Sequence, residues 1–219
     1  MIEKGIYFVS GIDTDCGKTF VTGSLARELM QSGHSVATQK LIQTGCEGIS
    51  EDILAHRQLM GIEPQEYDRS GTSCPIVFTH PCSPHLAAKI DNKVIDIKTI
   101  DNSTAELSAR FDTLLVEGAG GLAVPITEHY TMADYAADRN LPLIFVTSPR
   151  LGSINHTILN FEFCKAKNLT IKYLIYNNFG SSDQLIIDDT RDYIIAQVLK
   201  YFPQCEVLEL RDNKFIKLK

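Results

Sequence analysis

The chain has 219 residues, of which 44% are hydrophobic and 22% charged, a composition typical of a globular protein and unlike that of disordered or collagen-like chains. Its formal net charge of -6 argues against nucleic acid or an anionic membrane surface as the main partner. The length is sufficient for a large hydrophobic core, and we find no repeat, linker or charge run. We therefore predict a single domain over residues 1–219.

The amino terminus and the cysteines indicate a cytoplasmic protein. Met1–Gly5 lacks the basic start of a signal peptide, and no apolar run approaches the ~20 residues that a membrane span requires. The six cysteines form no C-x-x-C pair. This scatter is typical of reduced intracellular thiols, and it argues against a disulfide framework or a zinc site.

Short apolar runs alternate with amphipathic stretches along the whole chain. Several runs are continuous, which is typical of strands that are covered on both faces of a parallel sheet. The predicted strands are Ile6–Ser10, Ser35–Lys40, Thr113–Glu117, Leu143–Thr147, Ile171–Asn177 and Glu206–Leu210. The predicted helices are Lys18–Ser32, Glu51–Met60, Pro84–Lys89, Ser103–Arg110, Met132–Arg139, Ile154–Lys167 and Leu185–Tyr201. The alternation predicts a doubly wound α/β fold, with a loop-rich excursion at Gly61–Thr79.

A phosphate-binding loop is predicted between the first strand and the first helix, at Gly11–Thr19. Unpaired N–H groups at a helix start cradle phosphate oxygens, while Lys18 would reach the β/γ-phosphates and the Thr19 hydroxyl would bind Mg²⁺. The strict P-loop pattern requires glycine at position 12, where this chain has isoleucine, and Gly11 lies one residue too early. The alternative is a plain strand-to-helix turn with an exposed lysine.

Polar residues end three further predicted strands, where ligands of open α/β sheets bind. They are Lys40, Glu117 and Asn177. Glycines follow Glu117, so backbone can approach a ligand closely, and a carboxylate at a strand end suits Mg²⁺. The alternatives are a capping or salt-bridged Glu117, a strand-end Lys40 whose amine reaches solvent, and a helix-capping role for Asp52.

The histidines show no ligand spacing, and we interpret all six as surface or polar-core residues. Residue order alone indicates no Ser-His-Asp or Cys-His catalytic arrangement.

Five motifs, spread over most of the chain in a fixed order, resemble those of dethiobiotin synthetases, ATP-dependent ring-closing enzymes of biotin synthesis. The loop at Gly11–Thr19 is similar to the family's G-x-D-T-x-x-G-K-T, which contains the extra residue. Lys40–Gly45 resembles K-P-x-x-[ST]-G, with leucine in place of proline. The remaining three, resembling S-P-H-x-A-A, E-G-A-G-G-x-x-V-P and L-G-x-I-N-H, are Ser83–Ala88, Glu117–Pro125 and Leu151–His156.

The resemblance implies a homodimer of three-layer P-loop NTPase domains, each with a mostly parallel central sheet flanked by helices. It implies an ATP-dependent cyclo-ligase that converts 7,8-diaminononanoate, CO₂ and ATP to dethiobiotin, ADP and phosphate, through a carbamate and a carbamic–phosphoric anhydride. ATP would be a cosubstrate and Mg²⁺ a cofactor, with no nucleic acid or membrane partner. The family's terminal G-x-[IL]-P segment, which helps to enclose the base, has no counterpart in Cys205–Asp212.

The resemblance also implies roles for individual residues. Lys18, Lys40 and Thr14 would be catalytic, and Thr19, Asp52 and Glu117 would hold Mg²⁺. Thr44 would contact the diamine or its carbamate, while Gly152 and Asn155 would reach the substrate carboxylate across the dimer interface. The nucleotide would be bound by Asp15, Cys16, Gly17, Lys18, Thr19, Phe20, Asp52, Glu117, Gly118, Ala119, Gly120 and Asn177, the last at adenine.

Other P-loop classes remain as alternatives at this stage. A regulatory or partitioning ATPase of the deviant-Walker class would carry an additional lysine at the start of the loop, where this chain has Gly11–Asp13. An amidoligase of the cobyrinate synthetase type would need a second, glutamine-hydrolysing domain. A binding-only relative would be expected to lack Lys18, Thr19 or Glu117, and all three are present.

Overall fold

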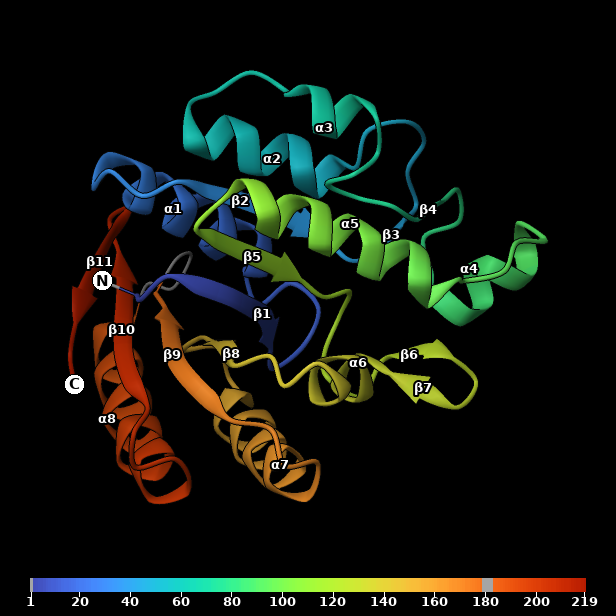
Figure 1. Cartoon of the computed structure of the whole chain (residues 1–219). Helices are drawn as coiled ribbons and strands as arrows, with labels where there is room; N and C mark the ends of the chain where they lie inside the picture. Colours follow the sequence, from blue (N-terminus) through green and yellow to red (C-terminus); the bar gives the residue numbers. More distant parts are fainter. Residues whose placement is uncertain (1, 179–182) are drawn as a thin grey trace.

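The computed structural model describes residues 2–178 and 183–219. Its centre is a seven-stranded sheet in the order β11-β10-β9-β8-β1-β5-β2 (Figure 1). All neighbouring strands are parallel except the last pair, β10 and β11, which form an antiparallel hairpin. The strands are β1 Gly5–Gly11, β2 Val36–Lys40, β5 Thr113–Glu117, β8 Leu143–Thr147, β9 Ile171–Asn177, β10 Glu206–Arg211 and β11 Lys214–Lys217.

The connections contribute two small two-stranded sheets and the helices. One small sheet pairs β3 with β4 and the other pairs β6 with β7. These strands are β3 Gln43–Thr44, β4 Val77–Phe78, β6 Pro125–Thr127 and β7 Tyr130–Thr131. The helices are α1 Lys18–Gln31, α2 Glu51–Met60, α3 Glu66–Arg69, α4 Pro84–Ile90, α5 Ile97–Arg110, α6 Met132–Asp138, α7 Ser153–Ala166 and α8 Gln184–Tyr201.

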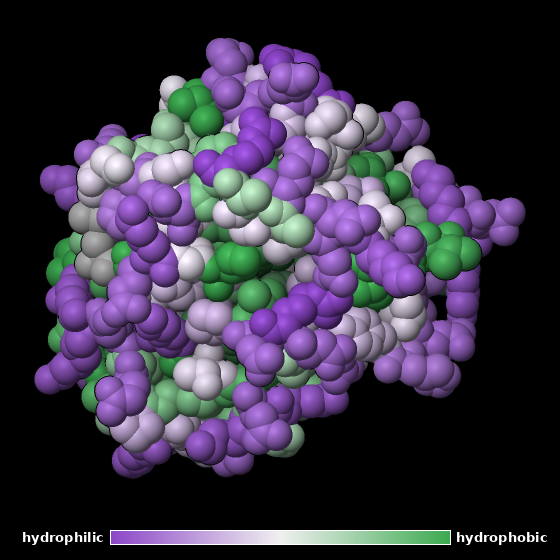
Figure 2. Space-filling model, in the orientation of Figure 1, coloured by the Kyte–Doolittle hydropathy of each residue, from purple (hydrophilic) through white to green (hydrophobic). Residues whose placement is uncertain are grey.

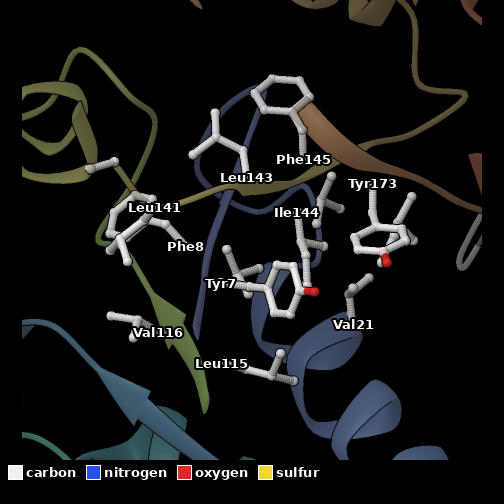
Figure 3. Close-up of a cluster of buried hydrophobic side chains, with 14 of the residues drawn as sticks. Tyr7, Phe8, Val21, Leu115, Val116, Leu141, Leu143, Ile144, Phe145 and Tyr173 are labelled. Atoms are coloured by element: carbon white, nitrogen blue, oxygen red, sulfur yellow. The ribbon is translucent and has the colours of Figure 1, made fainter. Parts of the chain in front are cut away.

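Apolar side chains on both faces of the sheet explain why its strands have continuous apolar sequences. Neighbouring residues of a strand point to opposite faces, and Figure 3 shows Tyr7 and Phe8 of β1 doing so. The Tyr7 ring lies 5.6 Å from that of Tyr173 on the face where Val21 of α1 packs. On the other face, Phe8 lies 6.1 Å from Tyr135 of α6. Helices therefore cover both faces, and the fold is the expected three-layer α/β arrangement.

The outer surface is mainly polar. In Figure 2 hydrophilic residues cover most of the visible face, and hydrophobic residues form smaller patches between them. Within the described residues no helix is both long enough and apolar enough to cross a membrane.

The six predicted strands are confirmed, whereas three parts of the prediction need correction. Helix α5 begins at Ile97 and not at Ser103, because the Asp96 side chain accepts a hydrogen bond from the Lys98 N–H and caps the helix. The excursion at Gly61–Thr79 contains a short helix and a strand. The sequence also gave no indication of β11, whose exposed residues include two lysines, a composition typical of an edge strand.

Candidate active site

The phosphate loop has the conformation that an anion site requires. Gly17 adopts a left-handed φ of 90° immediately before α1, and no side chain caps the helix start. The first turn of α1 also contains no acidic residue. Its N–H groups are therefore available to oxygen atoms of a phosphate.

Close packing explains the glycines of this irregular loop. A Cβ at Gly11 would lie 2.5 Å from Sγ of Cys16 and 2.9 Å from the Val146 carbonyl oxygen. A Cβ at Gly17 would lie 2.1 Å from Nδ2 of Asn177, which donates a hydrogen bond to the Cys16 carbonyl oxygen. Asn177, the last residue of β9, thus holds the phosphate loop in place through this hydrogen bond.

Lys18 is not the exposed lysine of a plain turn. Its side chain is buried, and Nζ donates a hydrogen bond of 2.8 Å to the Asp13 carbonyl oxygen. The amine therefore lies within the curve of the loop, where it can exchange this carbonyl for a phosphate oxygen. The loop residues Thr14 and Asp15 are exposed, Cys16 is buried and Phe20 packs against the core.

Lys40 joins the carboxylates that the sequence proposed as metal ligands. Its Nζ lies 2.5 Å from Oδ2 of Asp52 and 2.9 Å from Oε1 of Glu117. The Thr19 hydroxyl donates to the same Glu117 oxygen at 3.0 Å. The alternative for Lys40 is wrong, because the residue is 5% exposed and does not reach solvent, and the cap of α2 is Ser50, although Asp52 lies in the first turn. The alternative of a salt-bridged Glu117 is confirmed by its ion pair with Lys40.

The electrostatics keep this buried pair ionised. Burial acts to raise the pKa of Glu117, but the positive charge of Lys40 and a hydrogen bond from His56 outweigh burial and hold the pKa far below its usual value. Burial likewise acts to lower the pKa of Lys40, and the charges of Glu117 and Asp52 raise it instead. The site therefore contains two carboxylates already arranged around a cation.

The donor set fits Mg²⁺, which prefers carboxylate and hydroxyl oxygens and keeps several water or phosphate ligands. Asp52, Glu117 and Thr19 supply such oxygens from three different elements, and all three contact Lys40 or one another. In the described part of the chain no three His, Cys, Asp or Glu side chains form a metal cluster. Water or phosphate oxygens would complete the coordination of Mg²⁺ at such a site.

A cavity of about 480 Å³ opens beside these charges. Its walls come from the phosphate loop, the residues after β2, the start of α4 and the glycines after Glu117. It is lined by Thr14, Lys40, Ile42, Gln43, Thr44, Asp52, Pro81, Cys82, Ser83, Pro84, Ala119, Gly120 and Val124. The structure thus brings the predicted Thr14, Lys40 and Thr44 to one cavity, beside Asp52.

Gly118 supports the site through its backbone, since its carbonyl oxygen accepts a hydrogen bond from Lys40 Nζ. A Cβ at Gly118 would lie 2.8 Å from the Phe8 ring, so glycine is needed where the chain leaves β5.

Gly152 and Asn155, which the resemblance places at the substrate carboxylate across a dimer interface, do not line the cavity of the same chain. Both lie exposed at the start of α7, next to Leu151, which is 99% exposed. The adjacent Arg150 donates a 2.7 Å hydrogen bond to Asp13 of the phosphate loop. The segment before α7 is therefore bonded to the phosphate loop through Arg150, while Gly152 and Asn155 are exposed to solvent.

His56 is a polar contact of Glu117 that the sequence did not assign to the site. It is fully buried in α2, and its Nε2 lies 2.9 Å from Oε2 of Glu117. Its four-residue spacing from Asp52 places both on one face of α2, and this spacing was the available signal.

Comparisons with known proteins agree with one another. A family model described as an AAA domain matches residues 6–208. The ATP-dependent dethiobiotin synthetases of Pasteurella multocida and Haemophilus ducreyi are 48% and 49% identical to the chain, over 94% and 93% of this chain and 97% and 96% of theirs. The corresponding protein of Chlorobaculum tepidum is 47% identical over 97% of this chain and 90% of its own.

The similar solved structures are more distant. The signal recognition particle receptor FtsY of Elizabethkingia anophelis has a TM-score of 0.52 and 14% identity, over 99% of this chain. The chain spans 63% of that receptor's length. The chloroplast FtsY of Physcomitrella patens gives a TM-score of 0.51 at 15% identity, with 59% of its length covered. At such identities the likeness shows a shared fold and nothing more.

Proposed function

The chain belongs to the family of ATP-dependent dethiobiotin synthetases, and from this premise we propose how its residues carry out the family's reaction. It is an ATP-dependent cyclo-ligase, which forms dethiobiotin from 7,8-diaminononanoate, CO₂ and ATP. The relatives do not favour a regulatory or partitioning ATPase. The observation that carries the assignment of the site is the contact of Lys40 with both Asp52 and Glu117, together with the hydrogen bond from Thr19 to the same Glu117 oxygen.

The phosphate loop and its supports would bind the nucleotide. N–H groups from Asp15 to Phe20 would surround the phosphates, with the backbone of Gly118–Gly120 on the opposite side of the site. Asn177, which donates a hydrogen bond to the Cys16 carbonyl oxygen of the loop, would also contact the adenine. Thr19, Asp52 and Glu117 would hold Mg²⁺, which when bound neutralises phosphate charge during transfer.

The two buried lysines would stabilise the transferring phosphoryl group. One amine of the substrate combines with CO₂ to give a carbamate and a proton. A carbamate oxygen then attacks the γ-phosphorus and ADP leaves, and the second amine closes the ring on the carbonyl carbon as phosphate departs. Lys18 would neutralise charge on the nucleotide side and Lys40 on the carbamate side. No protein nucleophile is required, since the substrate supplies both nucleophiles.

The cavity suits the diamine end of the substrate. Thr14 and Thr44 supply hydroxyl groups at its wall, where they would accept from or donate to the amines and the carbamate. Gly152 and Asn155 are exposed and do not line this cavity. We therefore assign them to the carboxylate of a substrate that is bound mainly by a second copy of the chain, and this assignment requires a homodimer. Each chain would act as a single domain over residues 1–219 and would be cytoplasmic.

Purified protein tests the function directly. With ATP, Mg²⁺ and bicarbonate, ADP release should depend on added 7,8-diaminononanoate, and mass spectrometry should identify dethiobiotin. A folded protein that releases ADP at the same rate without the diamine would contradict the proposal and restore the regulatory ATPase.

A further inference from the structure

His56 occupies a buried position between the proposed metal site and a second, purely internal group of polar residues. Its Nε2 lies 2.9 Å from Oε2 of Glu117, and its Nδ1 lies 3.1 Å from Oγ1 of Thr38 on β2. Glu117 uses its other oxygen, Oε1, for Lys40 and Thr19. His56 therefore binds Oε2 of Glu117, and Oε1 remains on the side of the carboxylate that faces Lys40 and the proposed metal site.

Arg57 determines which nitrogen of His56 carries the proton. A guanidinium group can only donate, so Nη1 of Arg57 donates its 2.8 Å hydrogen bond to Oγ1 of Thr38. A hydroxyl oxygen can accept two hydrogen bonds, but among the described contacts Nδ1 of His56 is the only partner left for the Thr38 hydroxyl proton, and the Glu117 carboxylate can only accept from Nε2. Nδ1 accepts, Nε2 carries the proton, and the imidazole donates to Glu117.

Arg57 is itself fixed, so the orientation does not depend on a mobile side chain. It is 1% exposed and donates two hydrogen bonds, of 2.8 and 2.7 Å, to the carboxylate of Asp68. Its guanidinium also lies over the Tyr67 ring, 5.4 Å from the centroid. A continuous buried series thus runs from Asp68 through Arg57, Thr38 and His56 to Glu117.

We propose that His56 is a positioning residue, which holds Glu117 through Oε2 so that Oε1 is directed at the metal ion, with Thr38 and Arg57 fixing the donating tautomer. The inference rests on the proposed function, because it takes Glu117 as a metal ligand. Partners behind a ligand orient it, and their loss typically weakens metal binding by about 10- to 100-fold.

The test measures metal binding without turnover. Mn²⁺ binding to the enzyme complexed with a non-hydrolysable ATP analogue is followed by electron paramagnetic resonance. His56→Leu should raise the Mn²⁺ dissociation constant at least about tenfold, whereas His56→Gln, whose amide can donate from a similar position, should remain within about threefold of the wild type. Thr38→Val should weaken binding and Thr38→Ser should restore it.

Two controls separate positioning from general damage. Tyr7→Phe removes a part-buried hydrogen bond from a buried side chain to the Glu3 carbonyl oxygen, just before the start of β1, and should leave Mn²⁺ affinity unchanged. Binding of the analogue in the presence of a chelator should be equal in wild type and His56→Leu. A loss there as large as the loss of Mn²⁺ affinity would mean that His56 is only structural.

Glu117→Gln separates the two claims. If this variant keeps wild-type Mn²⁺ affinity, the proposed metal site is wrong, and the inference falls with it. If Glu117→Gln loses affinity while folded His56→Leu does not, the metal site stands and the role of His56 is wrong. Should His56→Leu not fold, equal Mn²⁺ affinities in Thr38→Val and Thr38→Ser would overturn the inference.

Discussion

Lys40 of β2 and Glu117 of β5 stand opposite each other in register at the carboxyl ends of neighbouring parallel strands, and Nζ of the lysine lies 2.9 Å from Oε1 of the glutamate. The side chains of both residues are buried. A buried charge without a partner is costly, so each of these residues requires the other. Because Asp52 contacts the same amine, the lysine occupies the space between the proposed metal ligands.

Lys40→Met therefore has separable effects on catalysis and stability. We expect diamine-dependent ADP release to fall by at least about 10³-fold, since a charge at the transferring group is lost. In metal-free buffer the free energy of unfolding should fall by about 3 to 5 kcal/mol, because the variant leaves the carboxylates unpaired. Mn²⁺ should bind the nucleotide-free variant more tightly than the wild type, since a competing cation is gone.

The control is Lys4→Met, which removes an exposed ion pair with Asp112 and should change both rate and stability little. The proposed role of Lys40 would be refuted if Lys40→Met turned over within tenfold of the wild type while binding Mn²⁺ unchanged.

The sequence predicted that Lys40 and Glu117 each end a strand, whereas neither the pairing of these two strands in register nor the contact of the two side chains was predicted. Apolar runs that end in polar residues predict strand ends at one edge of a sheet. The sequence does not show in which direction the Lys40 side chain extends or which groups its amine contacts. His56 shows the same limit: its helical spacing from Asp52 was visible, but its contact with Glu117 depends on how α2 packs against β2 and β5.

The excursion between α2 and β4 was the least predictable part of the fold. Its short helix is fixed by the ion pair between Arg57 and Asp68, residues from different elements whose approach is a tertiary event. In sequence, each charge is typical of an exposed helix. Both residues are buried only because α2, α3 and β2 pack together in the folded chain.

Asp68→Asn should make the free energy of unfolding depend less on pH in the acid range. Burial acts to raise the pKa of Asp68, but hydrogen bonds from Arg57 outweigh it and hold the pKa below its ordinary 3.8. A depressed folded pKa gives stability that is complete above the unfolded pKa and is lost as pH falls through the folded value. Urea unfolding should show the variant about 3 kcal/mol less stable near neutral pH, with the difference narrowing below about pH 4.

Asp112→Asn, at an exposed ion pair, is the matched control and should change the free energy of unfolding little. A constant difference between Asp68→Asn and wild type across the acid range would show that the pKa of Asp68 is the same in the folded and unfolded chains, which would contradict the lowered pKa.

Gly17→Ala should abolish tight nucleotide binding. Its φ of 90° is strained for alanine, and the added Cβ would lie 2.1 Å from Nδ2 of Asn177. The loop must move, and we expect ATP-analogue affinity to fall by at least about tenfold, as measured by calorimetry. Gly48→Ala is the control, since it has a φ of 76° and nothing within 4 Å of the added Cβ. It should lose about 1 to 2 kcal/mol of stability, the cost of left-handed backbone, and bind nucleotide normally.

The proposed sharing of each site between the two copies of a dimer predicts complementation between two defective chains. Asn155→Ala should raise the KM for the diamine, and Lys40→Met should abolish turnover. If Lys40 of one copy and Asn155 of the other serve the same substrate, a mixed dimer contains one site with both changes and one site with neither. Random reassortment of equal amounts should then recover about a quarter of wild-type activity at low diamine concentration, because half of the dimers are mixed and each has one intact site.

Analytical ultracentrifugation of the wild type should first show a dimer, and the mixture should be dissociated and reassociated before assay. The exposed Leu151, beside Gly152, gives an independent check, since Leu151→Asp would place a charge in the proposed interface and should shift the chain toward monomer. Activity of the mixture equal to the sum of its separate parts would show that each copy holds a complete site, and the exposure of Gly152 and Asn155 would then need another cause.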